Sequence, residues 1–320
     1  MSAPDLVVDA PRPLVQRRSR GDRVFRGLSL GAASVSLLII GSTAVFLAIG
    51  AIDAVDATGV SSFFTDSVWN ASLGKFGVYG LLVGTVMIAA IGLMVAVPLG
   101  LGLALFINEY APTRLRRPLT GAVDLLAAMP SIVFGMWGFF VFQSYIVGVA
   151  QFFADHLSAI PFFRVFAGET LTRSAFIAGI VVGFMILPIV TSVARDVMAQ
   201  APREQCEGAL ALGGTRWGMI RTVIFPFARS GIVGAGLLGF GRALGETIAV
   251  TIIVSLKYEP NYRILTQGGG SISQLIVTRF PEAQGLEISG LVAAGLVLFL
   301  FTLVVNLIAR RIVARARNAN

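Results

Sequence analysis

The chain has 320 residues, of which 56% are hydrophobic and only 13% are charged. Soluble domains carry about 25% charged residues, so this composition excludes a water-soluble globular protein and an intrinsically disordered one. One cysteine and one histidine exclude a disulfide-stapled fold and a Cys/His metal cluster within a single copy, and we expect no metal site. The formal net charge of +8 is compatible with more than one kind of partner, and the positions of the basic residues decide between them.

Apolar runs recur along the chain, each close to the length of about 20 residues that crosses a 30 Å hydrocarbon core. They lie at roughly 28–51, 77–106, 122–150, 175–193, 231–256 and 287–308. We therefore predict an all-α, polytopic membrane protein with six transmembrane helices. A tail over 1–27 precedes the membrane domain of 28–308, and a basic tail over 309–320 follows it.

Basic residues lie mostly on one side of these runs. Of the 25 lysines and arginines, eighteen lie in the two tails and in 107–121 and 194–230, and six lie in the other three loops. Positive loops stay in the cytoplasm, so both termini are expected to be cytoplasmic. The charge then indicates topology and contact with membrane lipid, and no nucleic acid partner is expected. Neither lysine lies in a phosphate-binding loop, so we expect this chain to bind no ATP.

The longest cytoplasmic loop, 194–230, is predicted to form two short helices separated by Gly213 and Gly214. Pro226 is expected to end the second helix. A short helix of small residues can seat in a groove on a partner, so this loop is a candidate docking surface. Its spacing runs from Glu207, Gly208 and Ala209 to Gly213, and after nine residues to Val223, Ile224, Phe225 and Pro226.

A second constellation is Gly-Arg-Ala-Leu-Gly-Glu at 241–246. Arg242 would be the twelfth residue of the fifth predicted span, roughly 17 Å into the membrane, where a charge costs about 2.5 to 3.5 kcal/mol. Glu246 lies four residues further, on the same face of a helix. Two interpretations remain open. The two residues form an ion pair that holds the bundle together, or Arg242 lines a passage and binds an anion such as phosphate, with Glu246 orienting it.

The outer loop 257–286 contains Ile272, Leu275, Ile276 and Arg279 at the spacing of one helical face. We predict a short amphipathic helix there, at the outer membrane interface.

The glutamate-and-glycine spacing of the 194–230 loop resembles the EAA motif of ABC importer permeases, with Gly208, Val223 and Phe225 as departures from it. The strings GVYGLLVGTVMIAAIGLMVAVPLGLGLALFINEYAP, AAMPSIVFGMWG and SGIVGAGLLGFGRALGETIAV extend the resemblance. Together they resemble the PstC-type permeases of bacterial phosphate-specific ABC transporters over about residues 22–310. The GRALGE and MPSIVFGMWG strings are the most specific parts.

The resemblance implies a type I importer permease that is a transport subunit and no enzyme. It implies that ATPase coupling residues are Glu207, Gly208, Ala209, Gly213 and Pro226, and that substrate-pathway residues are Arg242 and Glu246. The implied partners are a second permease of the PstA type, two ATPase subunits that bind ATP and Mg, and an extracytoplasmic phosphate-binding protein. The chain itself would hold no cofactor, and transport would proceed by alternating access.

Two other functions are compatible with parts of the pattern. An ABC permease for sulfate, molybdate or another solute shares the EAA motif, so only the GRALGE region and its flanking strings favour phosphate. A secondary anion transporter would show inverted repeats. We find no internal symmetry between 28–150 and 175–308, and such a carrier has no use for an EAA-like loop.

Overall fold

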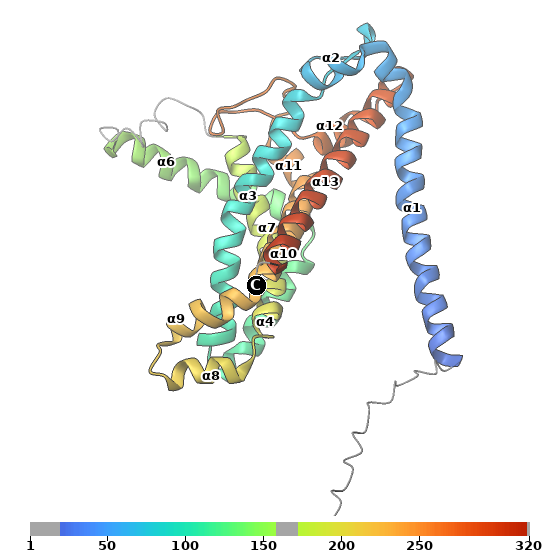
Figure 1. Ribbon diagram of the computed structural model, residues 1–320. Helices are drawn as coiled ribbons and strands as arrows, with labels where there is room; N and C mark the ends of the chain where they lie inside the picture. Colours follow the sequence, from blue (N-terminus) through green and yellow to red (C-terminus); the bar gives the residue numbers. More distant parts are fainter. Residues whose placement is uncertain (1–19, 158–171, 319–320) are drawn as a thin grey trace, which may run out of the picture. The chain divides into compact units, whose positions relative to one another are not determined.

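The computed structural model describes residues 20–157 and 172–318, and these are almost entirely helical (Figure 1). Most of the predicted N-terminal tail, residues 1–19, and the last two residues of the C-terminal tail lie outside the described residues. Within the described residues, six helices are long and apolar enough to cross a membrane, which confirms the predicted fold class. They are Gly21–Thr58, Tyr79–Tyr110, Ser131–Val149, Ala175–Met198, Arg216–Leu244 and Leu286–Arg311.

The elements follow one another with few irregular connections. In the first half they are α1 (Arg20–Thr58), α2 (Val60–Thr65), β1 (Trp69–Asn70), η1 (Ala71–Leu73), β2 (Lys75–Phe76), α3 (Tyr79–Leu105), η2 (Phe106–Tyr110), α4 (Thr113–Ala128), α5 (Ser131–Trp137), η3 (Gly138–Phe142) and α6 (Gln143–Leu157). In the second half they are α7 (Ala175–Met198), α8 (Arg203–Ala211), α9 (Arg216–Met219), η5 (Ile220–Ile224), α10 (Phe225–Leu244), α11 (Ile248–Ile253), α12 (Ile272–Arg279) and α13 (Leu286–Asn318). The elements η2, η3 and η5 are single π-helical turns within longer helices.

The chain divides into two compact units, Met1–Phe46 and Leu47–Asn320. In the first unit, residues 21–46 form the beginning of α1, and none of them is buried. The second unit contains the hydrophobic cores.

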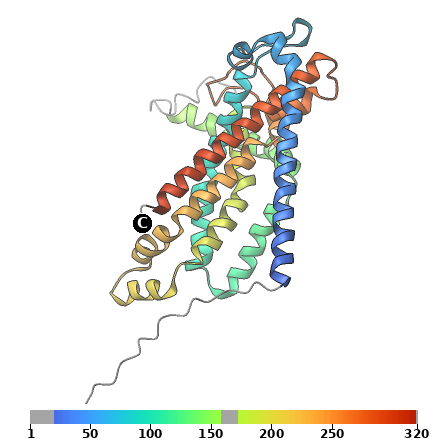
Figure 2. The same cartoon turned by 45° about the vertical axis from the view of Figure 1, so that its right-hand side comes forward.

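In the second unit, α3, α7 and α10 pack on one another (Figure 2). Gly92 of α3 faces Gly183 of α7 so closely that a Cβ on Gly183 would lie 3.0 Å from the Gly92 carbonyl oxygen. Gly239 of α10 leaves room for Val190 of α7. Small residues at such crossings let helix backbones approach, so glycine sets the spacing of these three helices.

The third span is shorter than the predicted 122–150. Two helices occupy this region, because α4 ends at Ala128 and a new helix begins at Ser131. Met129 between them is extended, with φ −67° and ψ 135°. Proline has no backbone N–H and disfavours a helical conformation at the residue before it, so Pro130 explains the break.

The fifth span also differs from the prediction of 231–256. The helix begins at Arg216 and runs through η5 into α10, which ends at Leu244. Residues 245–247 are not helical, and the short α11 follows them. A hydropathy count does not detect this break, because the sequence stays apolar on both sides of it. Gly245 has little helical preference, and the side chain of Glu246 starts a new helix.

The helix predicted in the outer loop exists as α12, but its predicted place at the membrane interface is wrong. Ile272 and Leu275, which open the helix, are fully buried. Its first amides find partners inside the protein, since Thr85 Oγ1 accepts from the Ile272 amide at 3.0 Å and Ser271 Oγ from the Gln274 amide at 3.1 Å. These hydroxyl groups permit the helix start to lie in the core.

Candidate functional site

The helix α8 carries Glu207, Gly208 and Ala209 and ends as the sequence predicts. Gly213 has φ +82°, and its amide donates to the Leu210 carbonyl at 3.0 Å. The Gly214 amide donates to the Ala209 carbonyl at 3.1 Å. These two bonds form a Schellman motif, which requires a left-handed residue after the helix and so explains a glycine at 213.

The second predicted helix of the loop is not short. From Arg216 onward, α9 is continuous with η5 and α10. The loop 194–230, called the coupling loop below after the role proposed for it, is therefore joined directly to a membrane span. Pro226 lies within this continuous helix, directly after the π-helical turn η5, so the prediction that it ends the helix is wrong. Proline and π-helical turns both commonly occur where a helix is distorted without ending.

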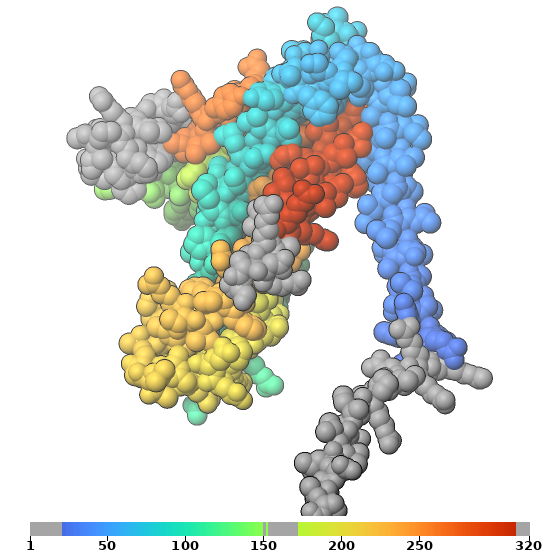
Figure 3. Space-filling model, in the orientation of Figure 1, coloured from blue at the N-terminus to red at the C-terminus, as the bar shows by residue number. Residues whose placement is uncertain are grey.

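The loop lies at one end of the second unit (Figure 3, yellow) and exposes two large apolar side chains. Leu212 is 91% exposed and Trp217 is 57% exposed, while Glu207 and Gly208 are also exposed. Ala209 and Cys206 face the other way and pack against the core. Exposed large apolar residues in a loop between membrane spans indicate a surface that a partner covers.

A polar cleft of about 440 Å³ lies behind α8. It is lined by Asn108, Glu109, Arg116, Met198, Ala199, Ala201, Arg203, Cys206, Glu207 and Ile224. Burial, together with the carboxylates of Glu109 and Glu207, raises the pKa of the Cys206 thiol. The thiol therefore stays protonated at neutral pH, as expected of a packing residue rather than a reactive one.

Arg242 and Glu246 are not arranged as a helical pair. Arg242 lies in the last turn of α10 and is exposed, whereas Glu246 lies beyond the helix end and is only 7% exposed. Glu246 Oε1 accepts from the Ala249 amide at 3.1 Å, and no ion pair joins these two residues. The expected position on one helical face is wrong because the helix ends between them, so Glu246 does not orient Arg242 in this structure.

Arg242 lies near the end of its helix. It is two residues before the end of the membrane-crossing helix Arg216–Leu244, and Gly239, three residues earlier, packs against Val190 and Ile186 of α7. The mid-membrane depth of Arg242 stays a prediction, because it was counted on a span, 231–256, whose bounds differ in the structure.

Polar side chains of α12 hold the backbone at both ends of α11. Ser273 Oγ of α12 donates to the Glu246 carbonyl at 2.8 Å, and Gln274 Nε2 donates to the Val254 carbonyl at 2.9 Å. The sequence analysis missed both residues. Two polar residues beside Ile272 and Leu275 in the helical pattern are the signal that could have indicated a buried polar contact.

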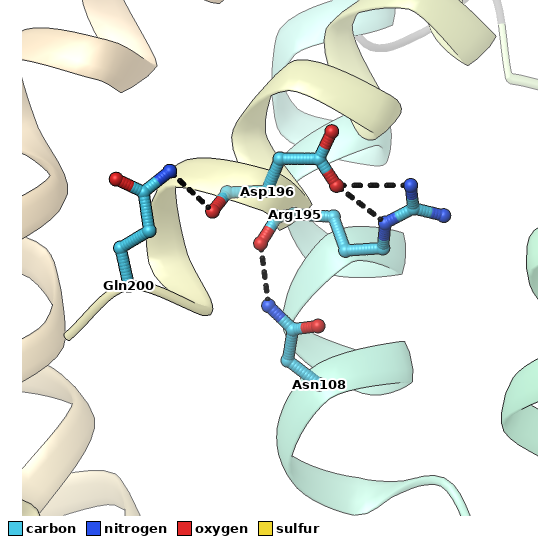
Figure 4. A network of polar contacts seen from close by, with 4 residues as sticks. All are labelled: Asn108, Arg195, Asp196 and Gln200. Atoms are coloured by element: carbon cyan, nitrogen blue, oxygen red, sulfur yellow. Dashed lines mark hydrogen bonds and ion pairs between the residues drawn. The ribbon is translucent and has the colours of Figure 1, made fainter. Parts of the chain in front are cut away.

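The end of α3 holds another residue that the sequence analysis missed. Asn108 Nδ2 donates to the Arg195 carbonyl at the end of α7, at 2.8 Å (Figure 4). The Arg195 guanidinium forms an ion pair with the neighbouring Asp196, with 2.9 Å between Nη2 and Oδ1. Gln200 Nε2 donates to the Asp196 carbonyl at 3.1 Å. The sequence signal for this contact is a single amide side chain, Asn108, at the end of an apolar span. Within the described residues, no group of three potential metal ligands is present.

Comparison with known proteins assigns these features to a family. The profile described as "Binding-protein-dependent transport system inner membrane component" matches residues 96–318. The chain belongs to this family. It is 38% identical to the phosphate transport system permease protein PstC 2 of Mycobacterium tuberculosis, over 98% of this chain and 96% of the relative. It is 36% identical to PstC of Xylella fastidiosa, over 93% of this chain and 92% of the relative.

Solved structures agree at the level of the fold. A bacterial alginate ABC transporter, in complex with its periplasmic protein, matches with a TM-score of 0.61 and 17% identity, over 92% of this chain and 95% of that chain. The inward-facing MetNI methionine ABC transporter matches with a TM-score of 0.53 and 15% identity, over 74% of this chain and 96% of that chain. The chain thus has the type I importer permease fold. It is a membrane-spanning transport subunit and no enzyme, and permeases of this family work with a separate ATPase and a binding protein.

Proposed function

We propose that this chain is the PstC-type permease of an ATP-driven phosphate importer and forms one half of its passage. The observation that carries the proposal is its identity of 36% to 38% with relatives named as phosphate permeases, over more than nine-tenths of each chain. The second half of the passage is a permease of the PstA type. The binding protein delivers phosphate from the outer side, and both termini of this chain are cytoplasmic in the inner membrane.

The loop from α8 to α9 docks on the ATPase, of which the importer contains two copies. This chain has no phosphate-binding loop, so ATP and Mg bind to those partners and not here. The exposed Leu212 and Trp217 support the proposal, because they are anchors of the kind that fill a groove on a partner.

Arg242 binds the anion during its passage. Arg242 is exposed, and no ion pair joins it to Glu246. A guanidinium can donate two parallel hydrogen bonds to phosphate. Glu246 contributes indirectly, by holding the break after α10, so that Arg242 stays at a helix end rather than inside a continuous helix. Closure of the ATPases then alternates access between the two sides.

Transport by the reconstituted complex tests this function. Vesicles contain this chain, the second permease and the ATPase, with the binding protein outside and ATP inside. We expect uptake of radioactive phosphate that requires both ATP and the binding protein. Uptake of sulfate or molybdate in place of phosphate would contradict the substrate assignment. Uptake by this chain alone, driven by an ion gradient, would make it a secondary transporter.

A further inference from the structure

The three central helices differ in how they are joined to the coupling loop. The helix α7 leads into α8 through residues 199–202, and α9 continues into α10. The helix α3 has no such continuity, because its end passes through η2 into α4. A movement of α8 and α9 therefore reaches α7 and α10 through the backbone, whereas it reaches α3 only through noncovalent contacts.

Packing holds the middle of α3 against α7. The Ile91 and Val95 side chains of α3 fit against Gly179 and Gly183 of α7, and the Val190 side chain of α7 fits against Gly100 of α3. The end of the helix, from η2 onward, lies beyond these positions. A directional hydrogen bond there would make the end of α3 move together with its neighbours.

Two consecutive residues of η2 make such bonds. Asn108 Nδ2 donates to the Arg195 carbonyl of α7 at 2.8 Å (Figure 4), and Arg216 Nη1 of α9 donates to the Glu109 carbonyl at 3.1 Å. Carbonyl groups in the last turn of a helix lack intrahelical partners, so the Glu109 carbonyl is available. One turn of α3 is thus bonded to the end of α7 and to the coupling loop.

The position of Arg216 is set by the loop itself. Thr215 caps α9 by accepting from the Gly218 amide at 3.1 Å, and the Schellman motif ends immediately before it. Arg216 is the first residue of α9, so any displacement of that helix displaces its guanidinium. A charged donor makes a stronger bond than a neutral one, which suits a contact that transmits movement.

We propose that Arg216 is a positioning residue that transmits the movement of α8 and α9 to α3, while Asn108 holds the end of α3 to α7. This inference rests on the proposed coupling to an ATPase. Arg216 occupies none of the defining positions of the EAA-like motif, and its role is to make substrate movement follow ATP hydrolysis.

The test compares Arg216→Gln with Arg221→Gln in the full importer complex in vesicles. Arg221 is an exposed arginine in the adjacent η5, and no side-chain bond of it is found among the described residues. We expect Arg216→Gln to retain ATPase binding and ATP hydrolysis but to import about fivefold less solute per ATP, the factor expected from losing one such hydrogen bond. Arg221→Gln should match the wild type. Arg216→Lys keeps a cationic donor and should restore most of the ratio.

Asn108→Leu provides an independent variant, because it removes the amide donor at similar volume, and it should lower the same ratio. An unchanged ratio in Arg216→Gln would overturn the proposal. Loss of ATPase binding in that variant would also overturn it, since Arg216 would then be a docking contact. The ratio is measured with the solute that the wild-type complex imports, so a wrong assignment of phosphate is recognised separately, by the wild type failing to import phosphate.

Discussion

Arg242 and Glu246 illustrate how much depends on a single helix end. Four residues apart in a continuous helix, they would share a face and could neutralise each other. In the structure α10 ends between them, and Glu246 turns to the Ala249 amide. The two residues therefore have separate roles, one as an exposed cation and the other as a buried acceptor.

Substitutions at these two positions should have different effects. Arg242→Gln removes the cation, so we expect phosphate uptake to fall at least about tenfold while the complex still assembles, because hydrogen bonds to charged groups contribute about 1.5 to 3 kcal/mol. Glu246→Gln keeps an acceptor oxygen for Ala249 and should retain most uptake. Both are measured as initial uptake rates in cells lacking the native permease. Equal loss of uptake in the two variants would favour an ion pair between Arg242 and Glu246. Unchanged uptake in Arg242→Gln would show that Arg242 does not bind the anion in the passage.

At the scale of elements, the coupling loop was largely predictable and the spans were only partly so. Gly213, with φ +82°, ends α8 where the sequence indicates, because few other residues tolerate that conformation. Span boundaries were wrong at Pro130 and Gly245. In both cases the apolar composition continues across a break in the helix, and hydropathy reports composition rather than hydrogen bonding.

Gly208 and Gly213 of the loop 194–230 should respond in opposite ways to substitution by alanine. Gly213→Ala places a Cβ on a left-handed residue and should destabilise α8 by about 1 kcal/mol, while Gly208→Ala in the helix interior should stabilise it by about 0.5 to 1 kcal/mol. No atom lies within 4 Å of a Cβ at Gly208, so the gain meets no steric cost. Hydrogen exchange of the α8 amides measures both changes. Faster exchange in Gly208→Ala would contradict the helix assignment.

At the scale of the whole molecule, the proposed docking surface and the proposed anion-binding residue lie apart. The exposed helix α8 comes just before the start of the helix Arg216–Leu244 at one end of the second unit (Figure 1), and Arg242 lies near the other end of that helix. Packed helices and a few directed hydrogen bonds connect the two places. Such an arrangement can move as rigid bodies, as alternating access requires.

Charge reversal on the docking surface should act through the partner and not through the fold. Glu207 is exposed, so Glu207→Lys is expected to leave folding unchanged. We expect the amount of ATPase that co-purifies with the permease complex to fall by roughly tenfold, because the lysine loses the contacts of the carboxylate and repels any basic group that it met on the ATPase. Glu204→Lys, one turn earlier in α8 and also exposed, is the matched control. Equal effects of the two variants would indicate a general charge effect instead of a specific contact at Glu207.

The sequence alone determined the membrane class, the six spans and the turn at Gly213, because apolar length, charge distribution and backbone freedom are local properties. Only the tertiary structure decided that Glu246 caps α11, that α12 begins inside the core and that Arg216 reaches the end of α3. These features depend on which donors and acceptors meet across segments far apart in the chain, and a helical period does not contain that information.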